Sequence, residues 1–262
     1  MTRNWLPAAA CLLAALLPPV ASSAEETSGV RTALDDTEQY FTSPLRWDAE
    51  DWSYFGVSLA AVAAAHAFDS RLRSDFATGS NAVLNGGKDK NSGVDAAPAV
   101  ALIVGTWFTA GYLRDSDGFA ETWRLLEAGA FSTVTAEGLS LAGGRERPDG
   151  TTSPNEWRKG GDSFPSVHTS AAFAIGMTFA ESGNDDYRWV RRILGYAVAG
   201  GTAYIRMKDN VHWLSDTVAG AALGVATARF VLNREDGGPS RGSLAFSPQK
   251  GGWMVSYNLP LR

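Results

Sequence analysis

Six apolar stretches rich in alanine and leucine constrain the fold of this chain more than any other feature. None shows the sustained apolar–polar alternation of a half-buried strand, and each is bounded by Gly, Asp or Asn, as helices commonly are. We therefore predict an all-α fold, a helical bundle of about six main helices. The predicted helices cover Trp52–Phe68, Ala96–Leu113, Glu121–Leu141, His168–Ala180, Val190–Ile205 and Val211–Leu232.

The connections between these helices are recognised by their composition. Ala77–Asp95 is rich in Gly, Asn and Ser, and Gly144–Gly161 carries two prolines and many charges, so both are predicted to be loops. Near the C-terminus, Arg234–Gly242 is typical of a linker. Ser243–Phe246 and Trp253–Leu259 then flank a segment with a proline and a Gly-Gly pair, which predicts a short tail like a β-hairpin.

The N-terminal residues resemble a secretory signal. Arg3 precedes a short apolar core, Leu6–Leu17, and small residues then lead to Ala24. This core is too short to span a bilayer comfortably, so a cleaved signal is favoured over an uncleaved membrane anchor. We therefore predict export to the bacterial periplasm or cell envelope. The predicted parts are a signal peptide at 1–24, a polar N-terminal arm at 25–51, a helical domain at 52–233, and a linker with a short β tail at 234–262.

Cysteine and charge exclude several classes of function. The single cysteine, Cys11, lies inside the apolar core of the signal, so the mature chain would have no disulfide and no thiol chemistry. Lipid attachment at Cys11 is disfavoured because the residue lies in the middle of that core. The formal net charge of −5 implies no strongly basic face, so nucleic acid is not an expected partner.

The length of the apolar runs bears on whether the helices cross a membrane. They are about 15 to 18 residues long, short of the ~20 that a spanning helix needs, and several carry charges. This favours a soluble or peripheral bundle that can associate with a membrane surface. Ala96–Leu113 has no charge at all and is the best spanning candidate, so the alternative of a spanning helix stays open.

Two of the three histidines lie among residues that suit phosphoryl chemistry. His212 and Asp216 are four residues apart, hence on one face of a predicted helix. A carboxylate there can accept the proton of one ring nitrogen and leave the other as a nucleophile or base. Arg206 could reach an anion that faces His212, and Asp209 and Asn210 are candidate helix-capping residues. An ordinary surface His–Asp pair is the alternative.

The second histidine lies in the sequence SFPSVHTS, Ser163–Ser170. Pro165 suits the first turn of a helix, and a helix start presents unpaired N–H groups that can bind phosphate. Ser166 adds a hydroxyl donor, and His168 could protonate a leaving oxygen as a general acid. A capped helix with a solvent-facing histidine is the alternative.

A third segment, GRERP at Gly144–Pro148, contributes Arg145 and Arg147. The planar guanidinium group of arginine matches phosphate oxygens and stays charged at any working pH. A charged surface loop is the simpler alternative. Three separate segments thus bring together the residue types that phosphoryl transfer requires: cations, helix-start amides, a nucleophile and an acid.

The three segments resemble, in order and internal spacing, the signature motifs of the type 2 phosphatidic acid phosphatase superfamily. That group also includes bacterial class A acid phosphatases and vanadium haloperoxidases. Its pattern runs Lys-x6-Arg-Pro, then Pro-Ser-Gly-His, then Ser-Arg-x5-His-x3-Asp. The resemblance spans about Ser140 to Asp216.

The resemblance implies a phosphatase that hydrolyses a phosphomonoester or diphosphate, above all a lipid phosphate, through a phosphohistidine intermediate. In this family pattern His212 attacks phosphorus, Asp216 orients His212, and His168 protonates the leaving alcohol. No metal or other cofactor is implied. The residues implied to hold the phosphoryl oxygens are Arg147, Arg206, Ser166 and the helix-start amides, which include that of Val167.

The chain departs from the family pattern at three positions. Ser140 occupies the lysine position and carries no charge, Val167 replaces the glycine and narrows the approach to phosphate, and Ile205 replaces the serine before the arginine. We predict that Arg145 compensates for the lysine by reaching into the phosphate site. A slow or inactive phosphatase is the alternative that these departures leave open.

Two further functions stay open at this point. A vanadate-dependent haloperoxidase would use the same site, because vanadate mimics a phosphoryl group, and a non-enzymatic envelope protein could keep the fold. The expected partner is a phosphorylated small molecule or lipid, and an apolar rim near Phe164 and Trp213 would suit a lipid. His66 matches no motif and is expected to be a packed or rim histidine.

Overall fold

The computed structural model describes residues 34–76, 92–113, 115–183 and 187–235, together with the backbone of residues 243–249 and 252–258. The predicted signal peptide at 1–24 lies outside the described residues. The chain divides into two units, residues 1–45 and residues 46–262. In the first unit, residues 34–42 are helical. They lie within the predicted polar arm at 25–51, and acidic side chains near the helix start complement the helix dipole.

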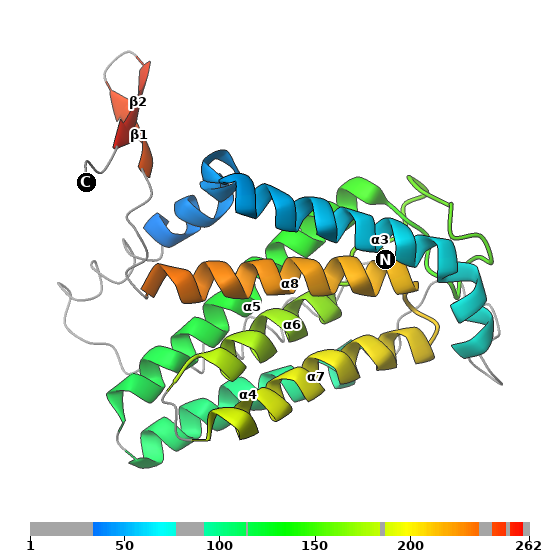
Figure 1. Ribbon diagram of the computed structural model, residues 1–262, viewed down its shortest axis with the longest axis horizontal. Coiled ribbons are helices and arrows are strands. Elements are labelled where there is room, and N and C mark those ends of the chain that lie inside the picture. Colours follow the sequence, from blue (N-terminus) through cyan, green and yellow to red (C-terminus); the bar gives the residue numbers. More distant parts are fainter. Residues whose placement is uncertain are drawn as a thin grey trace. The chain divides into compact units, whose positions relative to one another are not determined.

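The second unit confirms the predicted helical bundle (Figure 1). After a short 3₁₀ turn, η1 (Ser43–Arg46), its helices are α3 (Ala49–Phe76), α4 (Ser92–Leu113), α5 (Ser116–Gly143), α6 (Val167–Glu181), α7 (Arg188–Lys208) and α8 (Leu214–Glu235). The short α6 is the central helix, since it packs against α4, α5, α7 and α8. α3 lies along α8.

The C-terminal segment forms an antiparallel pair, β1 (Ser243–Gln249) and β2 (Gly252–Asn258). Ser243 is opposite Asn258 and Gln249 is opposite Gly252. Each strand differs from its predicted bounds, because β1 continues past Phe246 to Gln249 and β2 runs from Gly252 to Asn258 rather than from Trp253 to Leu259. Arg234 and Glu235, which were predicted to belong to the linker, are helical, because α8 continues to Glu235.

All six main helices begin at other residues than predicted, and the differences in α4 and α8 bear on the site. α4 starts at Ser92 rather than at Ala96, with Asp95 in its first turn, where a carboxylate is favoured by the helix dipole. α8 starts at Leu214, so His212 lies in the turn before the helix and not on it. Asp209 ends α7 as its C-cap, and Asn210 has φ 57°. Asn accepts this left-handed conformation more readily than most residues, which allows the sharp reversal there.

The ends of α5 and α6 carry caps that define the loop between them. α5 ends at Gly144, whose φ of 54° suits glycine and whose N–H bonds the carbonyl of Ser140 at 2.9 Å. α6 begins after Ser166, whose hydroxyl accepts from the N–H of Thr169. Pro165 therefore precedes the cap, and its predicted place in the first turn is wrong. Residues 144–166 form the long connection that carries the first two motifs.

Close contact between α6 and α8 brings the second and third motifs together. A Cβ atom added at Gly220 of α8 would lie 2.6 Å from the carbonyl oxygen of Ser166 and 3.2 Å from Cβ of Thr169. Only glycine leaves room for this approach. The start of α6 is thus held against α8 one turn beyond Asp216, and Ser166 N–H bonds the Asp216 carbonyl at 3.1 Å.

Candidate active site

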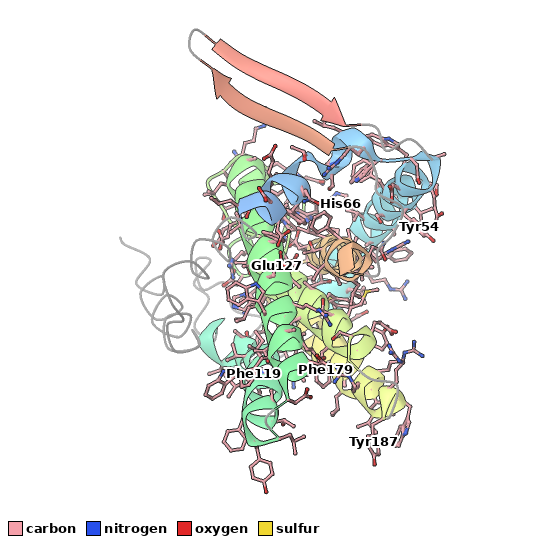
Figure 2. All side chains as sticks on the ribbon, turned by 90° about the vertical axis from the view of Figure 1, so that its left-hand side faces the viewer. Tyr54, His66, Phe119, Glu127, Phe179 and Tyr187 are labelled. Carbon is pink, nitrogen blue, oxygen red and sulfur yellow. The ribbon has the colours of Figure 1, made fainter. Side chains whose placement is uncertain are left out.

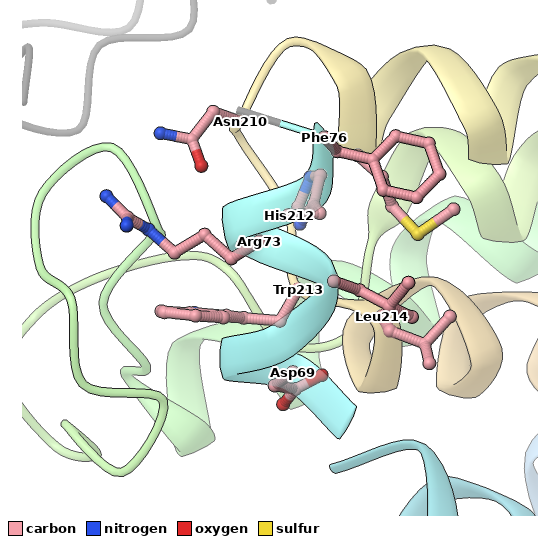
Figure 3. A pocket seen from close by; sticks show the side chains of 9 residues that line it. Asp69, Arg73, Phe76, Asn210, His212, Trp213 and Leu214 are labelled. Carbon is pink, nitrogen blue, oxygen red and sulfur yellow. The ribbon is translucent and has the colours of Figure 1, made fainter. Parts of the chain in front are cut away.

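The three motifs meet at one end of the bundle. This end is formed by the loop after α5, the start of α6, the end of α7 and the turn that leads into α8. Figure 3 shows this end from the side of α3, which runs beside the segment that carries His212. A small cavity of about 10 Å³ lies between them. It is lined by Asp69, Leu72, Arg73, Phe76, Met207, Asn210, His212, Trp213 and Leu214.

His212 is buried, with 4% of its surface exposed, and one of its ring nitrogens is held by the backbone. Nδ1 lies 2.8 Å from the carbonyl oxygen of Ser163. A carbonyl oxygen only accepts, so this contact requires the proton to be on Nδ1 and leaves a lone pair on Nε2. Asp216 is farther away, with Oδ2 3.7 Å from Nδ1. The carboxylate is therefore near His212, while the direct hydrogen bond comes from Ser163.

The environment of His212 favours its neutral form. Burial lowers the pKa of His212 well below 6.5, and the positive charges of Arg206, Arg147 and His168 lower it further, in that order. The hydrogen bond to Ser163 opposes this effect. A neutral imidazole at physiological pH keeps the electron pair that a nucleophile needs. The same three side chains, which the motifs predicted as site residues, act here on one ring.

The start of α6 contributes a half-buried His168 and a fully buried Ser166. The hydroxyl of Ser166 accepts hydrogen bonds from the N–H of Thr169 at 3.4 Å and from its hydroxyl at 3.0 Å. Ser166 is thus a helix cap whose hydroxyl oxygen accepts hydrogen bonds. Its hydroxyl proton could still be donated in a hydrogen bond to a phosphate oxygen. Val167, at the first helical position, is half-buried beside it.

Arg206 comes from the end of α7 and Arg147 from the loop after α5, and each is paired with a carboxylate. Arg206 is fully buried in the last turn of α7, and its Nη1 lies 2.5 Å from Oδ2 of Asp95 on α4. Arg147 is 8% exposed, and its Nε lies 2.6 Å from Oδ1 of Asp162. Each carboxylate fixes the direction of a guanidinium group that has further N–H donors.

Arg145 does not fit the predicted role of a phosphate ligand. It is fully buried, and its guanidinium group pairs with both Asp69 of α3 and Asp216 of α8. It also lies between two indole rings, 4.8 Å from the centre of the Trp157 ring and 5.5 Å from that of Trp213. The positive charge of Arg145 is therefore neutralised by carboxylates of the protein itself. Ser140, at the lysine position, is buried and carries no charge, and its hydroxyl makes no hydrogen bond within the described residues.

Sequence reasoning missed the carboxylates that hold these arginines. Asp69, Asp95 and Asp162 belong to no motif. Asp69 lies 76 positions from Arg145 and Asp95 lies 111 positions from Arg206, whereas Asp162 is 15 positions from Arg147. His66, predicted to be a packed or rim histidine, is half-buried and hydrogen-bonds Asp69 and Asn155, at 3.0 Å each. Among the described residues no group of three or more His, Cys, Asp or Glu could hold a metal ion.

Comparison with known proteins gives a family and one relative. Residues 121–236 match the model of the PAP2 superfamily. A relative from Porphyromonas gingivalis (strain ATCC 33277), named Lipid A 1-phosphatase, is 34% identical over 113 residues. The match covers 41% of this chain but only 23% of the relative. No solved structure matches the chain.

Proposed function

Residues 121–236 form a PAP2 superfamily domain, which confirms the resemblance seen in the motifs, and from this premise we propose that the protein is a lipid phosphatase with His212 as nucleophile. One observation carries the proposal. His212 is buried, and burial together with the nearby charges of Arg206, Arg147 and His168 lowers its pKa, which favours its neutral form. Cations around a neutral nucleophile fit an anionic substrate, because they stabilise the charge that develops during phosphoryl transfer.

The first step follows from the tautomer of His212. With Nδ1–H directed at the Ser163 carbonyl, the lone pair of Nε2 attacks phosphorus and forms an N–P bond. The P–O bond to the leaving alcohol breaks, and His168 gives its proton to that oxygen. Arg147, Arg206 and the N–H groups at the start of α6 bind the phosphoryl oxygens.

The second step returns the enzyme to its first state. His168, now neutral, takes a proton from a water molecule as that water attacks phosphorus. The N–P bond breaks, its electron pair returns to Nε2 of His212, and inorganic phosphate leaves. Asp216 and the Ser163 carbonyl favour the positive charge that the imidazole ring carries in the intermediate.

A lipid substrate fits the surface of the helices. Large apolar and aromatic side chains are exposed on α3, α4 and α7 in numbers that a protein surrounded by water would normally bury. Figure 2 shows Phe119 and Tyr187 at the end of the bundle away from His66. Examples with at least half of their surface exposed are Trp52, Val57, Phe68, Phe108, Tyr112, Leu113, Tyr187 and Trp189.

α4 gives the strongest sign of contact with a membrane. Within the described residues, Gly93–Leu113 is the one helix that is long and apolar enough to cross a bilayer, by length and composition. The core helix of a soluble protein passes the same test, but such a helix is mostly buried, whereas little of this one is covered by the protein. We infer an envelope protein whose α4 contacts or enters the lipid layer beside the site.

Phosphate release from the purified full chain tests the proposal. The substrates are phosphatidate, lipid A and p-nitrophenyl phosphate, each with and without detergent. We expect release from a lipid phosphate in detergent, and a loss of at least about 10⁴-fold in His212→Ala, because the nucleophile and its intermediate are gone. Brief incubation with ³²P-labelled substrate should label the wild-type chain with an acid-labile, alkali-stable phosphate that the variant lacks.

Two outcomes would contradict the proposal at different points. Preference for p-nitrophenyl phosphate without detergent would remove the lipid substrate and keep the phosphatase. Equal turnover in the wild type and in His212→Ala would remove His212 as nucleophile.

A further inference from the structure

Arg145 is a fully buried charged side chain near the site, and the mechanism above does not use it. Its Nη2 lies 2.7 Å from Oδ2 of Asp69, and its Nη1 contacts Oδ1 of Asp216 and lies 2.7 Å from Oγ of Ser215. Its Nε and Nη2 donate to the Pro154 carbonyl at 3.0 and 2.8 Å. The group has five N–H donors, and these contacts engage all three of its nitrogens. Arg145 is therefore directed away from a phosphate.

A continuous set of hydrogen bonds joins Arg145 to the nucleophile. The carboxylate of Asp216 accepts from the hydroxyl of Ser163 at 2.5 Å and from the N–H of Trp213 at 2.8 Å. Ser163 in turn accepts from Nδ1 of His212 through its carbonyl at 2.8 Å. The N–H of Ser163 also bonds the Arg145 carbonyl at 3.0 Å. A displacement of Asp216 would thus displace Ser163 and, through the Ser163 carbonyl, the imidazole ring of His212.

Asp69 ties this set to α3, a helix outside the part of the chain that matches the superfamily. Its Oδ1 accepts from the N–H of Ser215 at 2.9 Å and its Oδ2 from the hydroxyl of Ser215 at 2.6 Å. Asp69 has 1% of its surface exposed. A buried carboxylate needs such partners, because leaving it unpaired is strongly unfavourable.

We propose that Arg145 and Asp69 form a buried clamp that fixes the position of Asp216 and so positions His212 for attack. The clamp comprises these two side chains and Asp216, and it acts on the substrate only through His212. The proposal rests on the proposed function, since it assigns positioning residues to the same site. It replaces the predicted role of Arg145 as a phosphate ligand.

The charges around Asp216 give the clamp a measurable signature. Three titratable or charged side chains face it: Arg145 from the loop after α5, Asp69 from α3 and His212 from the turn before α8. Burial raises the pKa of Asp216 to about 7, the charge of Arg145 lowers it, and the charge of Asp69 raises it. Removing Arg145 and removing Asp69 should therefore move this pKa in opposite directions.

The first test replaces Arg145 with Met, which keeps apolar bulk between the two indole rings. We expect kcat to fall at least about 100-fold with KM within threefold, and inorganic phosphate to inhibit as it does in the wild type. The acidic limb of the kcat profile should move to higher pH, because Asp216 loses the cation that favours its charged form. Arg145→Lys keeps the charge, so it should recover part of kcat and leave the limb near its wild-type position.

The second test is Asp69→Asn, which removes a negative charge and keeps the size of the side chain. Here the acidic limb should move to lower pH, opposite to Arg145→Met, whatever the loss in kcat. General destabilisation would not produce opposite shifts. Because Asp69→Asn and Arg145→Lys change little volume, they test the clamp even if Arg145→Met does not fold.

The outcomes that overturn the clamp differ from those that overturn the phosphatase. A rise in KM of more than tenfold at unchanged kcat in Arg145→Met would mark a phosphate ligand instead. The clamp would also be rejected if the acidic limb of the kcat profile stayed in place in both Arg145→Met and Asp69→Asn, or moved in the same direction in both. If the wild-type protein hydrolyses no phosphate, the proposed function fails, and ¹³C NMR titration of the Asp216 carboxyl still measures the two opposite shifts without turnover.

Discussion

The two sides of His212 are built from different parts of the chain and use positive charge in opposite ways. On the side facing the substrate, Arg147, Arg206 and His168 come from the three motifs, and their charges lower the pKa of His212. On the side behind it, Arg145 lies between Asp216 and Asp69 and lowers the pKa of a buried carboxylate. The front of the site, formed by Arg147, Arg206 and His168, favours the neutral form of the nucleophile. The back, formed by Arg145 and Asp69, holds Asp216 in place, and Arg145 there opposes the rise in pKa that burial causes.

This difference teaches how to tell a ligand from a positioning residue among neighbouring arginines. Arg145 and Arg147 are two residues apart in one loop, and both are buried. Arg147 pairs with Asp162, which is itself partly exposed, whereas Arg145 pairs with two fully buried carboxylates. An arginine already neutralised on both sides has little attraction left for a phosphate. The predictions below test this division, beginning with the front.

Arg206→Met should have the largest effect of the four substitutions. Its charge has the largest electrostatic influence on His212, and it is fully buried, so its loss removes transition-state stabilisation that water cannot replace. We expect kcat/KM to fall about 10²–10³-fold, as for a single donor in other oxyanion sites. Lys208→Met, an exposed cation in the same turn of α7, is the matched control and should change it less than threefold. Equal losses in the two variants would indicate a general charge effect rather than a site.

His168→Asn should have an effect that depends on the leaving group. If His168 protonates the leaving oxygen, an alkyl phosphate with a poor leaving group should lose about 10²-fold in kcat. p-Nitrophenol leaves without a proton, so its phosphate ester should lose less than tenfold. Steady-state assays of both esters measure the ratio. A uniform loss for the two esters would assign His168 to the front as a phosphate ligand only.

The front of the site was predictable because its residues sit at short, fixed spacings. His212, Arg206 and His168 lie in segments whose residue types already suggest phosphoryl chemistry, and the structure brings those segments together. The role of each residue remains a proposal. One local detail differed, since α8 begins at Leu214 and not at Val211. Periodicity alone could not show that Asn210 would turn the chain before the helix.

The back of the site could not be predicted for a physical reason. Arg145 and Asp69 are 76 residues apart, and Asp69 lies on a helix whose sequence shows only an Ala-rich apolar pattern. Which carboxylate meets which arginine depends on how α3 packs along α8, and that is set by side-chain packing over the whole bundle. The motif spacing therefore identifies the residues that face the substrate, whereas the residues that hold Asp216 from behind are brought together only by tertiary packing.

Asp216→Asn tests the raised pKa of Asp216 through the pH dependence of the free energy of unfolding. Asp216 has a folded-state pKa of about 7, above the ordinary 3.8, so its protonation stabilises the fold below about pH 4, and this contribution is lost as the pH rises through 7. The variant does not titrate there, while His212 titrates in both proteins. The stability of the variant relative to wild type should therefore rise between pH 4 and pH 8, by on the order of 4 kcal/mol. Urea unfolding at several pH values measures it, and a difference independent of pH would contradict the raised pKa.

Arg73→Met tests the outer edge of the back and should have the smallest effect. Arg73 of α3 is half-buried, and its Nε donates to the carbonyl of Pro148 at 3.0 Å, which joins α3 to the loop that carries Arg145 and Arg147. Losing one such hydrogen bond should lower the free energy of unfolding by about 1 kcal/mol and kcat by less than tenfold. Arg71→Met, at an exposed position on the same helix, should change neither. Because the clamp joins α3 to α8 through fully buried pairs, it should keep its place when this outer contact is lost. A loss in kcat as large as that of Arg145→Met would mean that α3 is held by Arg73 and that the clamp follows it.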